Sequence, residues 1–367
     1  MDRFCCSMCT SRVFLFFFVL FGPFLSMAQE KDSVAKIELS GFVELYYGYD
    51  FDDNTSGSRY PFLFSHNRKN KVAVNLALIK ASFESGRFRA NLALQQGTYP
   101  QDNYSAEPKA LRWIHEANLG YALNTEKNVW LDVGVMPSHI GFESAISTEN
   151  LTLSRSIIAE NSPYFETGAK LSWQKNERWY FAFLYLNGWQ RIQSIPGRNN
   201  PSFGTQASFA PSEKVLFNWS TFLGTDQSKE AGTYLFFSDF YVDWKPAVSW
   251  HLIAGLDVGK RTLLLDADRN WWGTSLILQR RFTKSFASAI RYEYYHDPFQ
   301  AIAPSNVNEG IQTSGLSINT DWKIGQLLTF RLEGRWLQAP SEFNLGLDSG
   351  SSSNFFLLGS LAVNLNN

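Results

Sequence analysis

Cysteine is nearly absent from the sequence, and its few positions exclude several kinds of site. The chain of 367 residues has three cysteines, Cys5, Cys6 and Cys9, all close to the N-terminus. They lie in a segment that we expect to be removed on export, so the Cys-x-x-Cys spacing of Cys6 and Cys9 carries no metal or redox function. The exported chain must therefore fold without disulfides or thiolate metal sites.

Charge is also scarce. Charged residues make up 18% of the chain, whereas an ordinary globular protein has about a quarter. The formal net charge is -1, and Lys and Arg form no concentrated basic run. A nucleic-acid surface needs such a concentration, so we expect no nucleic-acid partner.

Long hydrophobic runs are absent except at the N-terminus. Arg3 and Arg12 precede an apolar run from Val13 to Leu25, and the small residues Ser26 and Ala28 follow it. This pattern predicts a signal peptide over residues 1–28, followed by a short periplasmic segment over 29–36. The run is too short to span a bilayer, which needs about 20 residues. If the exported chain enters a membrane, it must do so as strands.

Regular alternation of polar and apolar residues is abundant. The stretch 37–51 alternates apolar residues such as Leu45 and Tyr47 with polar ones such as Glu44 and Asp50. Side chains alternate between the faces of a strand, so this pattern predicts a two-sided strand. About 16 such segments, each of roughly 10 to 15 residues, recur along the chain, as in an outer-membrane barrel. Residues 72–84 and 179–186 alternate poorly, so which of their side chains face the lumen and which face outward is left open.

The connections between these segments alternate in length. Short polar turns are expected near residues 85–86, 124–128, 174–178, 211–214, 245–249, 281–284 and 323–325. Longer polar loops are expected between them, at 52–71, 98–110, 138–162, 189–201, 225–232, 261–270, 297–310 and 339–352. Short periplasmic turns and long extracellular loops are typical of an up-and-down transmembrane barrel, whose closure pairs every backbone group.

Aromatic residues gather near both sets of connections. Trp173, Trp179, Trp244 and Trp250 flank short turns, and Trp130 and Trp322 lie beside two more. Toward the long loops lie Tyr47, Tyr49, Trp189, Trp271, Trp272, Tyr294 and Trp336. This placement predicts two interfacial girdles, which would anchor the barrel among membrane lipids.

With these segments assigned, the chain resembles the OmpL-like family of Gram-negative β-barrel porins. The resemblance rests on "SGFVELYYGYDF", "VGVMPSHIGFESAISTENLTLSRS", "YFETGAKLSW" and "LNGWQRI", and it covers most of residues 36–365. It implies a porin-like pore and leaves the solute unassigned.

The stretch 135–160, "VMPSHIGFESAISTENLTLSRSIIAE", contains the longest of these connections. It mixes apolar residues with Glu143, Glu149, Arg155 and Glu160, which suits a loop that packs against a wall and presents charge to a channel. We therefore expect loop 138–162 to fold inward as a constriction, with an external cover as the alternative. An enzyme would have to pair His139 with Ser144, Ser147, Ser154 or Ser156, but sequence proximity does not supply that geometry and no G-x-S-x-G elbow is present.

The polar strand faces provide the other candidate site residues. Alternation points Arg291, Glu293, Arg331, Glu333 and Arg335 inward. A water-filled lumen would keep such charges hydrated, and rings of charge set channel selectivity. The alternative is a plugged barrel in which the same residues form ion pairs.

Metal binding has little support in the sequence. The five histidines are scattered, without metal-ligand spacing. Asp266, Asp268 and Asn270 have calcium-loop spacing, but Trp271 and Ile277 replace the glycine and glutamate that an EF-hand requires. We expect no metal and no cofactor.

The sequence thus predicts one all-β transmembrane domain over residues 37–367, located in the outer membrane. Its expected function is that of a porin for passive diffusion of small hydrophilic solutes or ions. Its expected partners are membrane lipid, the outer-membrane assembly machinery and, as an open question, further copies of itself. A barrel enzyme acting on lipid or peptide, and a structural or adhesive surface barrel, are the alternatives.

Overall fold

The computed structural model describes residues 35–51, 57–195, 197, 200–225, 233–263, 266–305, 310–340, 345 and 352–366. The predicted signal peptide and almost all of segment 29–36 lie outside these residues.

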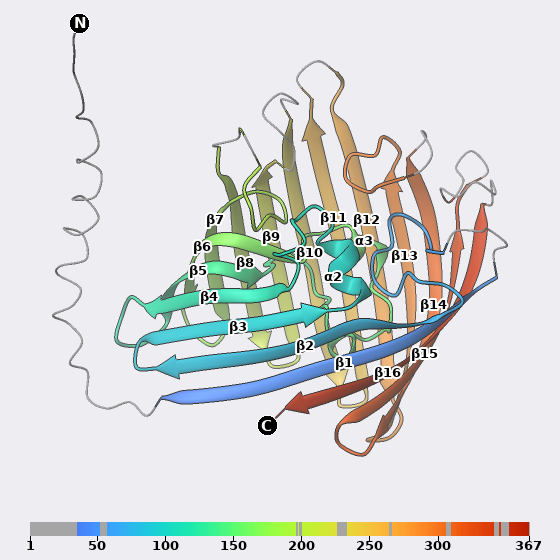
Figure 1. Cartoon of the computed structure of the whole chain (residues 1–367), viewed down its shortest axis with the longest axis horizontal. Coiled ribbons are helices and arrows are strands. Elements are labelled where there is room, and N and C mark those ends of the chain that lie inside the picture. The colour runs from blue at the N-terminus through green and yellow to red at the C-terminus, as the bar shows by residue number, and fades with distance from the viewer. Residues whose placement is uncertain are drawn as a thin grey trace, which may run out of the picture.

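The chain forms a closed barrel of 16 antiparallel strands (Figure 1). Each strand pairs with its neighbours in sequence, and β16 pairs with β1 to close the sheet. The strands are β1 (Lys36–Asp50), β2 (Val72–Ser85), β3 (Phe88–Gln96), β4 (Ile114–Ala122), β5 (Val129–Pro137), β6 (Phe165–Gln174), β7 (Trp179–Leu186), β8 (Ser202–Ser212), β9 (Val215–Gly224), β10 (Tyr234–Ala247), β11 (Trp250–Thr262), β12 (Arg269–Arg281), β13 (Phe286–Asp297), β14 (Ile311–Ile324), β15 (Leu328–Gln338) and β16 (Ser353–Asn366). The predicted all-β barrel and its strand number are confirmed.

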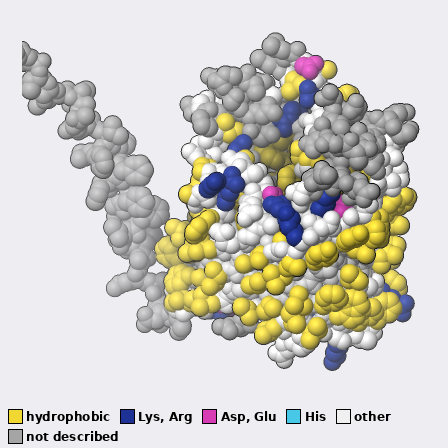
Figure 2. Space-filling view, turned by 45° about the vertical axis from the view of Figure 1, so that its right-hand side comes forward, with side chains coloured by type: hydrophobic (Ala, Val, Ile, Leu, Met, Phe, Trp, Pro, Cys, Tyr) yellow, Lys and Arg dark blue, Asp and Glu magenta, His cyan; other side chains and the backbone are white. Residues whose placement is uncertain are grey.

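Alternation along each strand separates an inner from an outer wall. In β1, Phe42, Glu44 and Tyr46 face inward and are at most 2% exposed, whereas Val43 and Leu45 face outward and are at least 40% exposed. Hydrophobic side chains form a band on the outer surface (Figure 2). A bilayer can accommodate this band because closure of the sheet leaves no unpaired strand edge.

The connections have the predicted division of lengths. Short turns join β2 to β3, β4 to β5 and each later even-numbered strand to the next odd one, at one end of the barrel. Gly86 (φ 56°) and Gly325 (φ 66°) occupy left-handed positions in two of these turns, where glycine has no Cβ penalty. The longer connections lie at the opposite end.

The two segments with poor alternation have separate structural reasons. The register between β1 and β2 shifts at Glu44/Leu45, so that Asn75 and Leu76 are both buried. This bulge places an extra residue in β2 and breaks the period of two. In β7, Ala182, Leu184 and Leu186 face inward yet are apolar, because they pack in a hydrophobic cluster inside the barrel.

Most of the predicted girdle residues are on the outer wall, with three exceptions. Trp173 and Trp244 near the short turns, and Trp272 and Trp336 near the long loops, are each more than 40% exposed. The placement of Trp130 and Trp271 in girdles was wrong, since they face inward and are 9% and 2% exposed. Trp189 also packs against the internal cluster, as alternation alone does not distinguish a lipid-facing from a buried aromatic residue.

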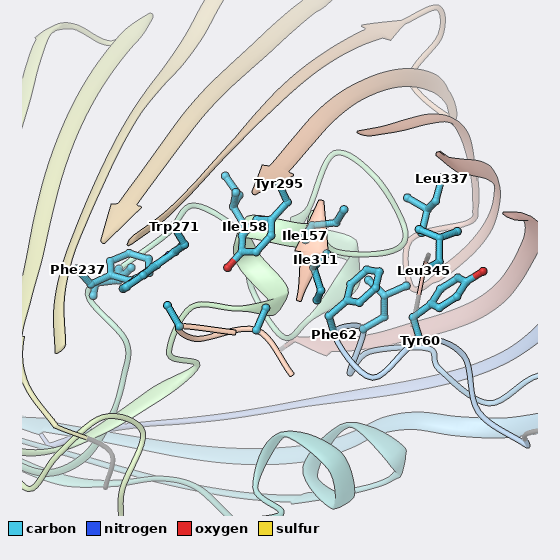
Figure 3. Close-up of a cluster of buried hydrophobic side chains, with 14 of the residues drawn as sticks. Tyr60, Phe62, Ile157, Ile158, Phe237, Trp271, Tyr295, Ile311, Leu337 and Leu345 are labelled. Atoms are coloured by element: carbon cyan, nitrogen blue, oxygen red, sulfur yellow. The ribbon is translucent and has the colours of Figure 1, made fainter. Parts of the chain in front are cut away.

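The interior is filled by segments from the long loops. The described helical segments are α2 (Thr98–Asn103), the 3-10 turn Ser147–Glu149 and α3 (Ile157–Glu160), and α3 packs against β12 and β13. Ile157, Ile158, Phe237, Trp271 and Tyr295 belong to an apolar cluster between loop and wall (Figure 3). Within the described residues, no helix has the length and hydropathy needed to cross a bilayer.

Candidate functional site: the inward loop and its anchoring wall

The connection between β5 and β6 enters the barrel directly after Pro137. At its root, His139 Nδ1 lies 2.7 Å from Glu166 Oε2, and His139 Nε2 lies 2.9 Å from the carbonyl oxygen of Thr221. A carbonyl oxygen only accepts, so Nε2 carries a hydrogen, and with Nδ1 donating to Glu166 the ring is an imidazolium. Burial alone would lower the pKa of His139, but the Glu166 carboxylate outweighs it and raises that pKa.

Gly204 on β8 makes room for this ring. A Cβ at Gly204 would lie 2.7 Å from His139 Cε1, closer than real contacts allow. Ser220 Oγ, on β9, donates to the carbonyl oxygen of His139 at 2.7 Å. The loop root is therefore fixed to β6, β8 and β9.

The middle of the loop is held by a buried group of charges on β13 and β15. Glu333 accepts the Ser154 backbone N–H at 2.6 Å and its hydroxyl at 2.9 Å. Arg291 donates to the Ser154 carbonyl oxygen at 2.6 Å and pairs with Glu333 at 2.9 Å. One loop residue thus has both its backbone groups bound by wall charges.

The same group of charges continues along the loop. Glu293 accepts the Ile157 backbone N–H at 2.8 Å and pairs with Arg335, whose Nη1 donates to the carbonyl oxygen of Arg155 at 3.2 Å. Arg331 pairs with Asp321 at 2.7 Å and donates to the carbonyl oxygens of Ser147 and Asn150.

These five predicted wall residues, Arg291, Glu293, Arg331, Glu333 and Arg335, do point inward, and each is at most 1% exposed. In this arrangement they contact the loop and one another. Hydrogen bonds to charged groups contribute about 1.5–3 kcal/mol each, and breaking a buried pair costs about 3–5 kcal/mol. The wall therefore holds the loop in one conformation.

The four predicted loop residues have different surroundings. Glu143 accepts hydrogen bonds from the backbone and hydroxyl of Ser156, the N-cap of α3. Burial raises the pKa of Glu143, although Arg291 and Ser156 oppose the rise. Glu149 is exposed.

Arg155 and Glu160 are both buried. The Arg155 guanidinium stacks 4.0 Å from the centre of the Tyr164 ring and donates to the carbonyl oxygen of Ala159 at 3.0 Å. Burial would lower the pKa of Arg155, but Tyr164, Tyr99 and Glu160 raise it, so the group stays charged. Glu160 accepts from Tyr164 Oη at 2.8 Å.

A second inward segment, residues 57–71, was not predicted from the sequence. The Glu160 carboxylate accepts the backbone N–H of Phe64 at 2.9 Å, and Asn161 donates to the carbonyl oxygen of Phe62 at 3.3 Å. Tyr60 and Phe62 stack on each other and belong to the internal apolar cluster. The two closely spaced aromatic residues were a weak signal in the sequence that this segment folds inward, since an external loop seldom buries several aromatic residues.

The residues considered for catalysis and metal binding are used in other ways. Ser147 donates to Glu44 at 2.6 Å and Ser154 to Glu333, while His139 contacts Glu166 and Thr221. Asp268 pairs with Lys260 at 2.5 Å. Among the described residues, no group of three or more His, Cys, Asp or Glu side chains could hold a metal ion.

A closed 16-strand antiparallel barrel with an apolar outer band and long loops folded into its lumen is the architecture of an outer-membrane porin. A family model described as "Putative beta-barrel porin-2, OmpL-like" matches residues 36–365. The chain belongs to this family, as the sequence resemblance predicted. A search of curated proteins finds no significant match.

Solved structures show the same fold at very low sequence identity. An anion-selective porin from Comamonas acidovorans has a TM-score of 0.61 at 9% identity, covering 90% of this chain and 100% of the other. OmpF of Salmonella typhi, in complex with daunomycin, has a TM-score of 0.60 at 9% identity, covering 90% and 98%. The outer membrane channel DcaP of Acinetobacter baumannii has a TM-score of 0.59 at 9% identity, covering 90% and 97%. These likenesses support the fold.

Proposed function

We propose that the barrel is a channel for passive diffusion of small hydrophilic solutes or ions, and that loop 138–162 forms its constriction. The observation that carries this proposal is the course of the loop, which crosses the lumen between its root at β6 and β9 and its anchors on β13 and β15. A barrel of this strand number is wide enough to leave an aqueous channel, so an inward loop determines the passage that remains.

In this proposal the predicted site residues have two roles. Arg291, Glu293, Arg331, Glu333 and Arg335 hold the loop, and so set the width of the constriction. On the loop, Glu143, Arg155 and Glu160 maintain its fold, and the exposed Glu149 is the one whose carboxylate can meet solute directly.

A channel is favoured over an enzyme by the contacts of His139. Nucleophilic catalysis needs a serine within hydrogen-bond reach of the base. Both ring nitrogens of His139 are engaged by Glu166 and Thr221. The chain's proposed partners are membrane lipid, the assembly machinery and the permeating solute.

We further propose that the barrel associates with copies of itself. The outer faces of β2, β3 and β4 carry Ala77, Ala81, Ala90 and Ala117 among larger side chains such as Leu92. Small residues allow close approach of two walls. Chemical crosslinking of the barrel in detergent tests this contact, and an exclusively monomeric product would contradict it.

Conductance in planar bilayers tests the channel. The purified, refolded chain should give stepwise conductance, and deletion of residues 147–156 should raise the size of each step because the constriction is removed. Deletion of residues 266–268, in the connection between β11 and β12, is the matched control and should leave the steps unchanged. A barrel with heat-modifiable gel mobility but no conductance would contradict the channel, and steps of unchanged size after the first deletion would contradict the constriction.

A further inference from the structure

A polar cavity lies against the wall opposite the loop anchors. It has a volume of about 390 Å³ and is lined by residues of β1 to β6, among them Glu84, Arg89, Asp132, Pro137 and Lys170. Glu84 lies next to the short turn after β2, and Pro137 is where the inward loop leaves the wall. The cavity thus extends from the short-turn end of the barrel to the root of the loop.

Most charges around this cavity are already paired. Arg89 binds Asp132 through two hydrogen bonds, with Nε 2.7 Å from Oδ1, and it stacks 4.0 Å from the centre of the Trp130 ring. Lys80 pairs with Glu116 at 2.7 Å, and Lys36 pairs with Glu38. Glu84 is exposed at the rim.

Lys170 is the exception. It lies directly opposite Asp132 in the register of β5 and β6. Asp132, however, is turned toward Arg89 across Gly120, where a Cβ would lie 2.3 Å from Asp132 Oδ1. Glu166, the next acid along β6, is bound to His139. Among the described residues, no hydrogen bond or ion pair is made by the Lys170 ammonium group.

An unpaired cation inside a cavity acts on a solute more strongly than paired or rim charges do. The field of an ion pair largely cancels at the distance of a passing solute, and water and salt screen the exposed Glu84. The partly buried Lys170 is screened less. The unpaired ammonium group of Lys170 therefore gives this wall a net preference for anions.

We propose that Lys170 is a specificity-determining residue of the channel, favouring small anions that carry a carboxylate or phosphate group. This inference rests on the proposed channel function. It places the permeation route along the wall from β2 to β6, beneath the loop root, because the polar cavity lies there.

The reversal potential across a bilayer with a potassium chloride gradient tests this role. Lys170→Gln should lower the chloride-to-potassium permeability ratio by about two- to threefold, the effect of one unit charge acting on an ion at close range through water. Lys170→Glu should lower it further, and Lys170→Arg should restore the wild-type ratio. Lys323→Gln is the matched control, since it removes one exposed positive charge at the short-turn end of β14, outside the cavity.

The outcomes separate this inference from the channel itself. A wild-type barrel without conductance overturns both. A conducting wild type in which Lys170→Gln and Lys323→Gln change the ratio equally, or in which Lys170→Gln changes nothing, overturns the role of Lys170 alone. Inorganic phosphate in the bath should reduce chloride current more in wild type than in Lys170→Gln, and equal reduction would overturn the proposed anion class.

Discussion

The two walls of the lumen carry similar residues but use them differently. On β13 and β15, arginines and glutamates are at most 1% exposed and bind the backbone of the inward loop. On β3 to β6, Arg89, Asp132, Glu116 and Lys170 line a polar cavity, where Arg89 binds Asp132, Glu116 binds Lys80, and the ammonium group of Lys170 makes no ion pair with any described residue. The alternation that turns a charge inward is the same on both sides. The difference is whether a loop covers the charge.

This contrast explains how one barrel can be both filled and open. A charge group that is covered by a loop must satisfy that loop's backbone groups, because burying an unpaired N–H or C=O is costly. A charge group that faces water has no such constraint. Its pairs can rearrange, and a residue such as Lys170 can stay unpaired.

The largest expected effect comes from breaking the anchoring wall. Glu333→Gln removes the charge that pairs with Arg291 and accepts two hydrogen bonds from Ser154. Loss of one partner of a buried ion pair costs about 3–5 kcal/mol, so we expect the loop to detach and trypsin to cut at Arg155. Proteolysis and current noise in the open channel measure this release. Glu213→Gln, at the exposed turn between β8 and β9, is the control, and equal protease resistance of both variants would contradict the anchoring role.

The loop root should respond to pH. Because the pKa of His139 is raised in the folded protein, its charge stabilises the root fully below the ordinary histidine value of about 6.5, and this stabilisation is lost as pH rises through the higher folded value. The charge-assisted bond to Glu166 contributes about 1.5–3 kcal/mol. Closures or current noise should therefore increase as pH rises above about 6.5 in wild type. In His139→Gln the closures and the current noise should be independent of pH. A wild type whose closures and noise also do not change with pH would contradict the imidazolium assignment.

The same kind of change on the opposite wall should have a smaller effect. Glu116→Gln breaks the ion pair with Lys80, whose side chain is 30% exposed. The Glu116 side chain is 8% exposed, but the ammonium group of Lys80 can be hydrated once Glu116 is replaced. Loss of this pair should therefore cost less than loss of Glu333, and the loop should stay resistant to trypsin. Release of the loop in this variant would show that the two walls are not functionally distinct.

The smallest effect is expected at Glu149. It is the exposed member of the predicted loop residues, and surface substitutions usually change stability by less than about 0.5 kcal/mol. Glu149→Gln should therefore leave melting and protease resistance unchanged while shifting ion selectivity slightly. A large loss of stability would place Glu149 among the anchors.

The predictability of the fold and that of the site differ for a physical reason. The barrel follows from local signals, because a period of two and a regular division of turn lengths both act within one or two strands. These local signals did not predict the burial of Asn75 or Trp271. Asn75 lies in a bulge that depends on the pairing with the neighbouring strand, and Trp271 packs in an internal cluster that depends on the inward loop. For the site, alternation placed Arg291 and Glu333 inward, but their partner Ser154 is more than 130 residues away from either.

The sequence by itself determined the membrane-compatible barrel, its strand number and the sign of every inward charge, because side-chain alternation and turn chemistry are encoded residue by residue. Only the tertiary structure decided which charges are covered. Closure of the sheet brings β13 and β15 opposite β3 to β6, and the middle of the loop places its backbone N–H and C=O groups against β13 and β15. That placement leaves Glu333 buried as an anchor and Lys170 free in a cavity.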